Sequence, residues 1–185
     1  VGWVLWRDVA DLPDELVFHV SYLGGDMPTF QINFSRPAGQ VIAQYFDFVR
    51  FGRAGYTAIH GCSHEIAQYC AEEIGTVDGF EIIHDGDPSK GIPTVVWTQT
   101  EGSDHSFTLY DLADRLRMRG WQVPAYPFTG ELAHKAFQRI LVKRGFTREM
   151  ADLLLADMKQ AIAYLRLHPP KAVPSPAQQG SYNHL

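Results

Sequence analysis

Cysteine is scarce in this sequence of 185 residues, and long apolar runs are missing from it. The two cysteines, Cys62 and Cys70, are eight positions apart in one expected helix. That spacing separates them by about 12 Å along the helix axis, which is too far for a disulfide. We therefore expect two free thiols, as is typical of a cytoplasmic protein. No apolar run approaches the length of a membrane span, so no membrane span is expected.

Excess positive charge is also missing, because 16 Lys and Arg face 21 Asp and Glu, giving a net charge of −5. With no basic stripe, the chain is not expected to bind nucleic acid. The sequence has no Gly-x-Ser-x-Gly, no Walker glycine loop and no dinucleotide-binding fingerprint. His60 and His64 share a helical face, but Cys62 and Glu65 point away from that face, so no third ligand is evident nearby. We therefore interpret them as surface histidines and expect no metal site.

What the sequence does contain is a clear series of helix and strand patterns. It opens with the mainly apolar segment VGWVLWR at residues 1–7, without an initiator methionine or a leader. This pattern is typical of a strand with neighbours on both sides, so we expect a chain cut from a longer polypeptide. The letters GGDMP at residues 24–28 are expected to form a flexible loop.

The remaining patterns predict a small α+β domain, within the α/β class. Helices are expected over residues 37–51, 56–74, 108–120 and 147–167, and strands over 80–84, 92–99, 121–125 and 136–143. Residues 11–14 are expected to turn into a short segment that ends near residues 19–22. The buried stripe of the last helix is expected to contain Met150, Leu154, Met158, Ile162 and Leu165. From residue 56 onward the order of elements predicts a small, mainly antiparallel sheet with helices on one face.

The start of the first helix has the chemistry of an anion site. It follows the letters INFSRPAGQ at residues 32–40. Pro37 suits the first helical turn, which leaves Ser35 or Arg36 as the cap. Free N–H groups and the positive end of the helix dipole can hold a phosphate there. The same residues can equally form nothing more than a helix start.

Arg139 is the most informative single residue. Strand alternation places it on the same face as Phe137 and Leu141. If that face is buried, the guanidinium needs an anion, and its fork suits a carboxylate. The alternatives are an internal Asp or Glu partner, or an edge position from which the side chain reaches water.

Four stretches resemble a known family. They are YLGG at residues 22–25, INFSRPAGQVIAQY at residues 32–45, RGWQVPA at residues 119–125, and Arg139-Ile140 with Arg144-Gly145-Phe146. Together they resemble the C-terminal part of bacterial and plant glutamate decarboxylases, over essentially the whole chain. The resemblance implies the aspartate-aminotransferase-like fold. Residues 1–57 are then the trailing edge of the large cofactor-binding domain, residues 58–168 the small C-terminal domain, and residues 169–185 a mobile tail.

The resemblance also implies a reaction and its residues. The family uses pyridoxal 5′-phosphate to convert L-glutamate to 4-aminobutyrate. Ser35 matches a serine that contacts the cofactor phosphate of a neighbouring subunit in a homo-oligomer, and Phe34 stands beside it. Arg139 matches an arginine near the substrate carboxylate. Tyr22 matches a catalytic tyrosine on a mobile loop over the active site, and His184 matches a penultimate histidine that plugs the site at neutral pH in some bacterial members.

One departure from the family pattern stands out, because the Ser-x-His-Lys motif of the cofactor lysine is not in this sequence. Lys135 follows His134, but Leu132 stands where the serine is required, so the match is attributed to chance. Without that lysine the chain alone is expected to be inactive and to hold no covalent cofactor. A calmodulin partner is not expected, because the tail is not a basic amphipathic helix. Two other functions stay open: a non-catalytic α/β interaction or regulatory module, and a decarboxylase of another amino acid.

Overall fold

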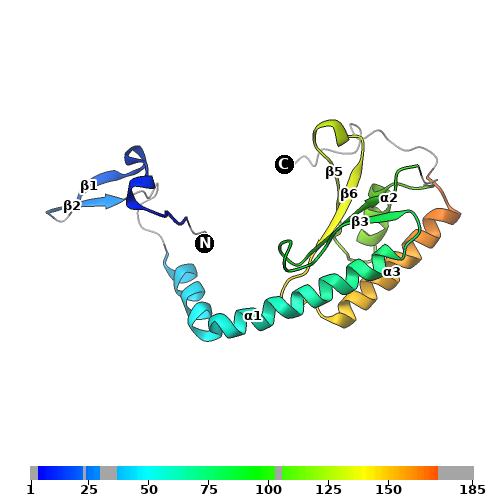
Figure 1. Cartoon of the computed structure of the whole chain (residues 1–185), viewed down its shortest axis with the longest axis horizontal. Helices are drawn as coiled ribbons and strands as arrows, with labels where there is room; N and C mark the ends of the chain where they lie inside the picture. The colour runs from blue at the N-terminus through cyan, green and yellow to red at the C-terminus, as the bar shows by residue number, and fades with distance from the viewer. Residues whose placement is uncertain (1–3, 23, 30–36, 103–105, 171–185) are drawn as a thin grey trace. The chain divides into compact units, whose positions relative to one another are not determined.

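The chain folds into two compact units, Val1–Gly55 and Tyr56–Leu185 (Figure 1). The computed structural model describes residues 4–22, 24–29, 37–102 and 106–170. Each unit has its own sheet, one with two strands and one with four. The units are therefore treated separately below.

The first unit contains a β-hairpin where the sequence pattern predicts a loop. Its elements are the 3-10 helices η1 (Val9–Asp11) and η2 (Asp14–Leu16), the strands β1 (Phe18–Tyr22) and β2 (Gly25–Thr29), and the first part of helix α1 (Gly39–Gly75). The strands pair antiparallel, and Gly24 supplies a positive φ of 79° between them. The expected loop at residues 24–28 is therefore wrong, because the backbone of these residues forms a ladder with β1. Pro28 is tolerated there, since each strand of a two-stranded sheet has an unpaired edge.

The expected strand over residues 1–7 is wrong in its described part. Residues 4–7 are irregular, and the side chains of Val4 and Leu5 are 72% and 88% exposed. A strand needs a partner for its backbone hydrogen bonds, and the described part of the chain offers none to this segment. Residues 1–3 lie outside the described residues.

Helix α1 begins later than Pro37, which corrects the expected start. Its first residue is Gly39, and the carbonyl of Ala38 accepts the N–H of Ile42 at 3.0 Å. Inside α1 the backbone of Gly52 is non-helical, with φ 53° and ψ −168°. Because this conformation favours glycine, Gly52 separates two helical parts, as the sequence predicts.

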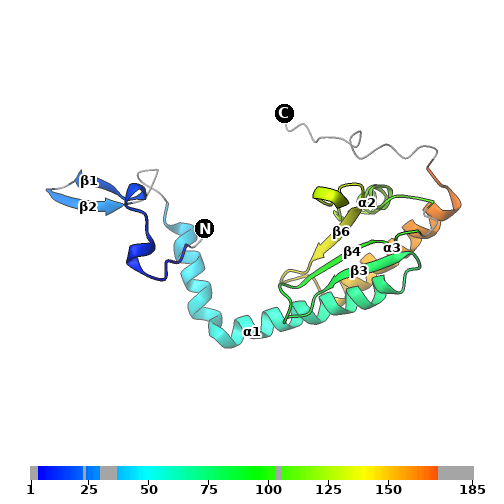
Figure 2. The same ribbon diagram turned by 45° about the horizontal axis from the view of Figure 1, so that its top comes forward.

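The second unit confirms the expected antiparallel sheet. Its strands are β3 (Phe80–Asp85), β4 (Thr94–Gln99), β5 (Ala125–Pro127) and β6 (Ala136–Leu141), and its helices are the second part of α1, α2 (Leu109–Arg117) and α3 (Arg148–Leu167). The strand order is β3-β4-β6-β5, with every neighbouring pair antiparallel (Figure 2). The strand expected over residues 121–125 is displaced to β5.

The helices cover one face of this sheet. Trp97 of β4 and Gln138 of β6 are register partners with no exposed surface, and they point into the face where α1, α2 and α3 contribute their buried side chains. The opposite face, which includes Arg139, is not covered by these helices. Most of the expected α3 stripe is confirmed, namely Leu154, Met158, Ile162 and Leu165. Met150 is a correction: it is 38% exposed at the edge of the stripe, and Ala151 takes the buried position.

The starts of α2 and α3 are set by local capping residues. Thr108 and Asp111 form a capping box, in which the Thr108 hydroxyl accepts from the Asp111 N–H and the Asp111 carboxylate accepts from the Thr108 N–H. The Thr147 hydroxyl accepts from the Met150 N–H at 3.3 Å. Over the described ranges, no helix combines the length and the apolar character that crossing a lipid bilayer requires.

Candidate functional site

Arg139 lies in the middle of the uncovered sheet face. It is exposed, and Leu141 on the same face is 45% exposed. Strand β6 lies between β4 and β5, so the exposure comes from the open face and not from an edge position. Among the residues that the structure describes, no Asp or Glu forms an ion pair with Arg139. Of the interpretations that the sequence leaves open, the internal carboxylate partner is therefore not found in the described part of the chain.

The guanidinium of Arg139 instead rests on an aromatic group. Its Cζ atom lies 5.1 Å from the centre of the Tyr126 ring, within the range of a cation–π interaction. The Tyr126 ring lies 5.7 Å from the Phe137 ring, and the Phe128 ring lies 4.9 Å from Phe137. We call Tyr126, Phe128 and Phe137 the aromatic platform.

Two members of the platform, Tyr126 and Phe128, are not identified from the sequence. The strand expected there ends at residue 125, one position before Tyr126. The alternation of aromatic residues around Pro127 was the available signal. It becomes meaningful only with the pairing of Tyr126 opposite Phe137.

This arrangement is suited to binding a carboxylate. A guanidinium with one face on a ring keeps its N–H groups free in the plane. Two of those groups can donate in parallel to the oxygens of one carboxylate. The apolar flanks Phe137 and Leu141 reduce competition from water, which strengthens such a contact. The face can therefore hold an anionic group brought to it from outside the described residues.

The RGW segment at residues 119–121 has a structural role in this unit. Nε and Nη2 of Arg119 donate to Oδ1 of Asp157 at 2.9 and 2.8 Å, and Nε1 of Trp121 donates to Oδ2 at 2.8 Å. Asp157 is on α3, and its side chain is only 16% exposed. The Trp121 hydrogen bond and then the Arg119 guanidinium lower the pKa of this carboxyl. The motif thus fixes the segment after α2 to α3, just before the chain enters β5.

Asp157→Asn is expected to destabilise the chain by about 1.5–3 kcal/mol at pH 7, because it removes charge-assisted hydrogen bonds. The pKa of Asp157 is lower in the folded state, so its contribution is present above the unfolded pKa of about 4 and is lost as the pH falls through the folded pKa. Urea unfolding at several pH values measures both effects, with the exposed Asp114→Asn on α2 as the control. An equal loss in both variants, or a difference independent of pH, contradicts the prediction.

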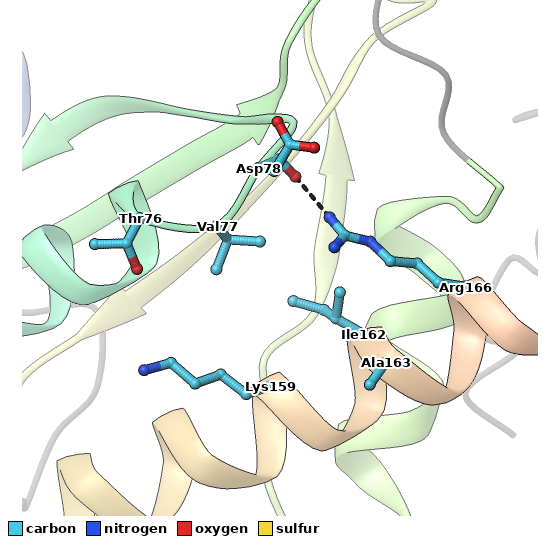
Figure 3. Close-up of a pocket in the computed structure, with 7 residues that line it drawn as sticks. All are labelled: Thr76, Val77, Asp78, Lys159, Ile162, Ala163 and Arg166. Carbon is cyan, nitrogen blue, oxygen red and sulfur yellow. Dashed lines mark hydrogen bonds between the residues drawn. The ribbon is translucent and has the colours of Figure 1, made fainter.

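A groove of about 330 Å³ lies between α3 and the segment after α1 (Figure 3). It is lined by Thr76, Val77, Asp78, Lys159, Ile162, Ala163 and Arg166. Arg166 donates to the carbonyl oxygen of Asp78 at 2.8 Å, and Lys159 donates to the carboxylate of Glu73 at 2.8 Å. Both cations already have partners within the chain, so these polar groups join α3 to the end of α1.

The described histidines and cysteines do not form a metal site. Nδ1 of His64 lies 2.6 Å from the carbonyl oxygen of Gly86, and His60 stacks on Tyr56. Within the described ranges, no three His, Cys, Asp or Glu side chains are grouped to hold a metal ion. Cys62 is exposed and Cys70 is buried, and both are free thiols as the sequence predicts. Burial raises the pKa of the Cys70 thiol to about 11, which makes it a poor nucleophile.

Of the other expected site residues, Tyr22 alone lies within the described ranges. Tyr22 is the last residue of β1 and pairs with Gly25, so it ends a strand and does not lie in a loop as expected. It belongs to the first unit, whereas Arg139 belongs to the second. Phe34, Ser35 and His184 lie outside the described residues, as do residues 171–185 of the tail expected over residues 169–185.

Comparison with known proteins identifies the family. Residues 1–99 match the family model described as the pyridoxal-dependent decarboxylase conserved domain. The chain belongs to the pyridoxal-dependent decarboxylase family. It is 46% identical over 184 residues to a glutamate decarboxylase of Aliivibrio fischeri, covering 100% of this chain and 39% of that protein. It is 51% identical over 162 residues to a glutamate decarboxylase of Lactococcus lactis subsp. cremoris, covering 88% and 34%.

Similar solved structures support the fold. The glutamate decarboxylase of Lactobacillus brevis superposes with a TM-score of 0.77 at 46% identity, covering 86% of this chain and 36% of that one. A sphingosine-1-phosphate lyase of Burkholderia pseudomallei superposes with a TM-score of 0.66 at 20% identity, over 88% and 34%, and shows the fold alone. The expected aspartate-aminotransferase-like fold is confirmed. The chain spans little more than a third of the length of these relatives.

The described residues do not fit the attachment site of the family's cofactor. A lysine that holds pyridoxal 5′-phosphate must be unpaired and turned into the active site. Lys90, Lys135 and Lys159 instead form ion pairs on the surface with Asp85, Glu101 and Glu73. Lys143 is exposed beyond the end of β6. Within the described residues, Arg139 and its surroundings therefore remain the candidate site.

Proposed function

We propose that this chain is the C-terminal part of a glutamate decarboxylase, which converts L-glutamate to 4-aminobutyrate and CO2 with pyridoxal 5′-phosphate. The observation that carries the proposal is the Arg139 guanidinium, which is supported by an aromatic ring and has no acidic partner in the described part of the chain. Glutamate is a dicarboxylate, so a free guanidinium matches its chemistry. The name shared by the similar proteins of Aliivibrio fischeri and Lactococcus lactis supports the same substrate.

In this proposal Arg139 binds and orients one substrate carboxylate. Its planar N–H edge accepts the two oxygens of the carboxylate side by side, which fixes the position and the direction of the substrate. Phe137 and Leu141 flank the contact and keep water from competing with it. The cofactor, when bound, supplies the electron sink for the bond that breaks.

The remaining site residues complete the proposal. Ser35, with Phe34 beside it, is assigned to the cofactor phosphate of a neighbouring subunit in a homo-oligomer. Helix α1 begins at Gly39, shortly after Ser35 in the sequence. The unpaired N–H groups of its first turn could therefore donate to the same phosphate. Tyr22 is assigned to the active-site entrance, and His184 to a plug that closes the site at neutral pH. A cytoplasmic location fits the two free thiols.

The test is the activity of the full-length protein that contains this chain, with the 185 residues alone as a control. We expect the full-length protein to form 4-aminobutyrate from glutamate and to hold a cofactor whose absorbance survives dialysis. The 185 residues alone are expected to do neither, because the sequence lacks the lysine motif. A stronger preference for another amino acid overturns the substrate. Failure of the full-length protein to hold any cofactor overturns the enzyme and favours a non-catalytic module.

A further inference from the structure

We propose that Tyr126 is a positioning residue that holds Arg139 ready for the substrate carboxylate. This inference rests on the proposed function, because it assumes that Arg139 binds that carboxylate. Tyr126 acts through Arg139, and no contact between Tyr126 and the substrate is required.

The contact arises from the pairing of β5 with β6. Tyr126 is the register partner of Phe137, so both side chains lie on the open face of the sheet. Arg139 is two residues further along β6 and therefore on the same face. Arg139 and Tyr126 are therefore diagonal neighbours, and the guanidinium carbon lies 5.1 Å from the centre of the Tyr126 ring.

Tyr126 is itself held from two sides. On the open face its ring packs against Phe137, which in turn packs against Phe128. On the covered face, the fully buried Gln138 donates from Nε2 to the carbonyl oxygen of Val123 at 2.8 Å, close to the start of β5. That hydrogen bond joins β6 to the segment that leads into Tyr126.

The consequence concerns the freedom of Arg139. An exposed arginine on an open face has many side-chain conformations, and binding a carboxylate requires one of them. The ring of Tyr126 attracts the face of the guanidinium and leaves its N–H edge free. A partly fixed guanidinium loses less entropy when the substrate binds. Removal of the ring should therefore weaken substrate binding while the charge of Arg139 stays in place.

The test uses the full-length enzyme with three single variants. Tyr126→Leu should lower kcat/KM for glutamate about 3- to 30-fold, mainly through KM, because it removes the ring. Tyr126→Phe retains the ring and should stay within about twofold of wild type. Phe128→Leu is the matched control, because it also removes a ring that packs on Phe137, whereas the cation–π contact of Arg139 is with Tyr126. Equal losses for Tyr126→Leu and Phe128→Leu overturn the proposal.

A double variant separates this inference from the proposed function. Tyr126→Leu should have no further effect on kcat/KM in an Arg139→Met background, since Tyr126 acts through the guanidinium. If Arg139→Met alone leaves kcat/KM unchanged, the proposed role of Arg139 fails. If Arg139→Met lowers kcat/KM and Tyr126→Leu does not, or if the two losses simply multiply, only the role of Tyr126 fails.

A second measurement tests the proposal if the Tyr126→Leu protein does not fold. Phenylalanine with increasing numbers of ring fluorines is incorporated at position 126, which weakens the negative face of the ring with little change in shape. We expect kcat/KM for glutamate to fall stepwise with each added fluorine. A kcat/KM that stays constant across the series overturns the proposal.

Discussion

Arg139→Met in the full-length enzyme is expected to lower kcat/KM for glutamate about 30- to 1000-fold. The range corresponds to about 2–4 kcal/mol of lost transition-state binding, the usual result of removing a charged hydrogen-bonding partner. Methionine keeps an unbranched apolar side chain on the sheet but donates no hydrogen bonds. The loss is expected in kcat/KM, because the carboxylate contact is present from binding through to the transition state.

The thermal stability of the variant should stay close to that of wild type. Arg139 is exposed, and its guanidinium makes a cation–π contact with Tyr126 but no ion pair within the described part of the chain. A change at such a position usually alters the free energy of unfolding by no more than about 0.5 kcal/mol. A large loss of activity with an unchanged melting temperature therefore indicates a binding role.

The control for Arg139→Met is Lys143→Met, which removes one positive charge beyond the end of β6. Lys143 is exposed and is not on the strand that carries Arg139. We expect its kcat/KM to stay within about twofold of wild type, because salt screens an exposed charge that does not contact the substrate. An Arg139→Met enzyme that also stays within a few-fold of wild type shows that Arg139 does not bind the substrate carboxylate.

Local sequence signals account for the elements that were predicted correctly. Thr108 and Thr147 cap their helices through hydrogen bonds to residues three positions away, so the information lies within a few residues. Gly52 breaks α1 through its own backbone conformation. Each of these signals can be seen in one short stretch of sequence.

The errors concern structure that depends on distant partners. Residues 24–28 look like a loop until β1 is placed beside them, and residues 4–7 look like a strand although no described strand pairs with them. The shift of the strand expected at residues 121–125 to β5 has the same cause, since its register is set by β6. Strand pairing is non-local, and a single sequence does not specify it.

The candidate site was likewise predictable only where local sequence determines it. Alternation in β6 indicates which neighbours share a face with Arg139, but the sequence does not show that this face is open or that Tyr126 lies under the guanidinium. Tyr126 and Arg139 are neighbours only because of the pairing between β5 and β6. The roles of Phe34, Ser35, Tyr22 and His184 came from the resemblance to the family, and they remain predictions.

Gly86→Ala is expected to destabilise the chain by about 2–4 kcal/mol, the second large effect. Gly86 follows β3 with a φ of 79°, a conformation that alanine adopts only with strain. A Cβ atom at this position would lie 2.6 Å from the Cβ of Ala67, which is fully buried on α1. The turn is also held against α1 by His64, whose Nδ1 lies 2.6 Å from the Gly86 carbonyl oxygen. The turn must therefore move away from the helix or lose this contact.

Two variants separate the clash from the backbone strain when unfolding is measured in urea. Gly102 has a φ of 77° with nothing within 4 Å of an added Cβ, so Gly102→Ala should show the strain alone, about 1–2 kcal/mol. Adding Ala67→Gly to Gly86→Ala removes the nearest atom and should make the combined loss smaller than the sum of the two single losses. The rescue should be partial, because backbone atoms of Ala67 and Gln68 remain 3.3 Å away. Equal losses for the two glycines, or strictly additive losses in the double variant, would show that the approach of Gly86 to α1 does not limit stability.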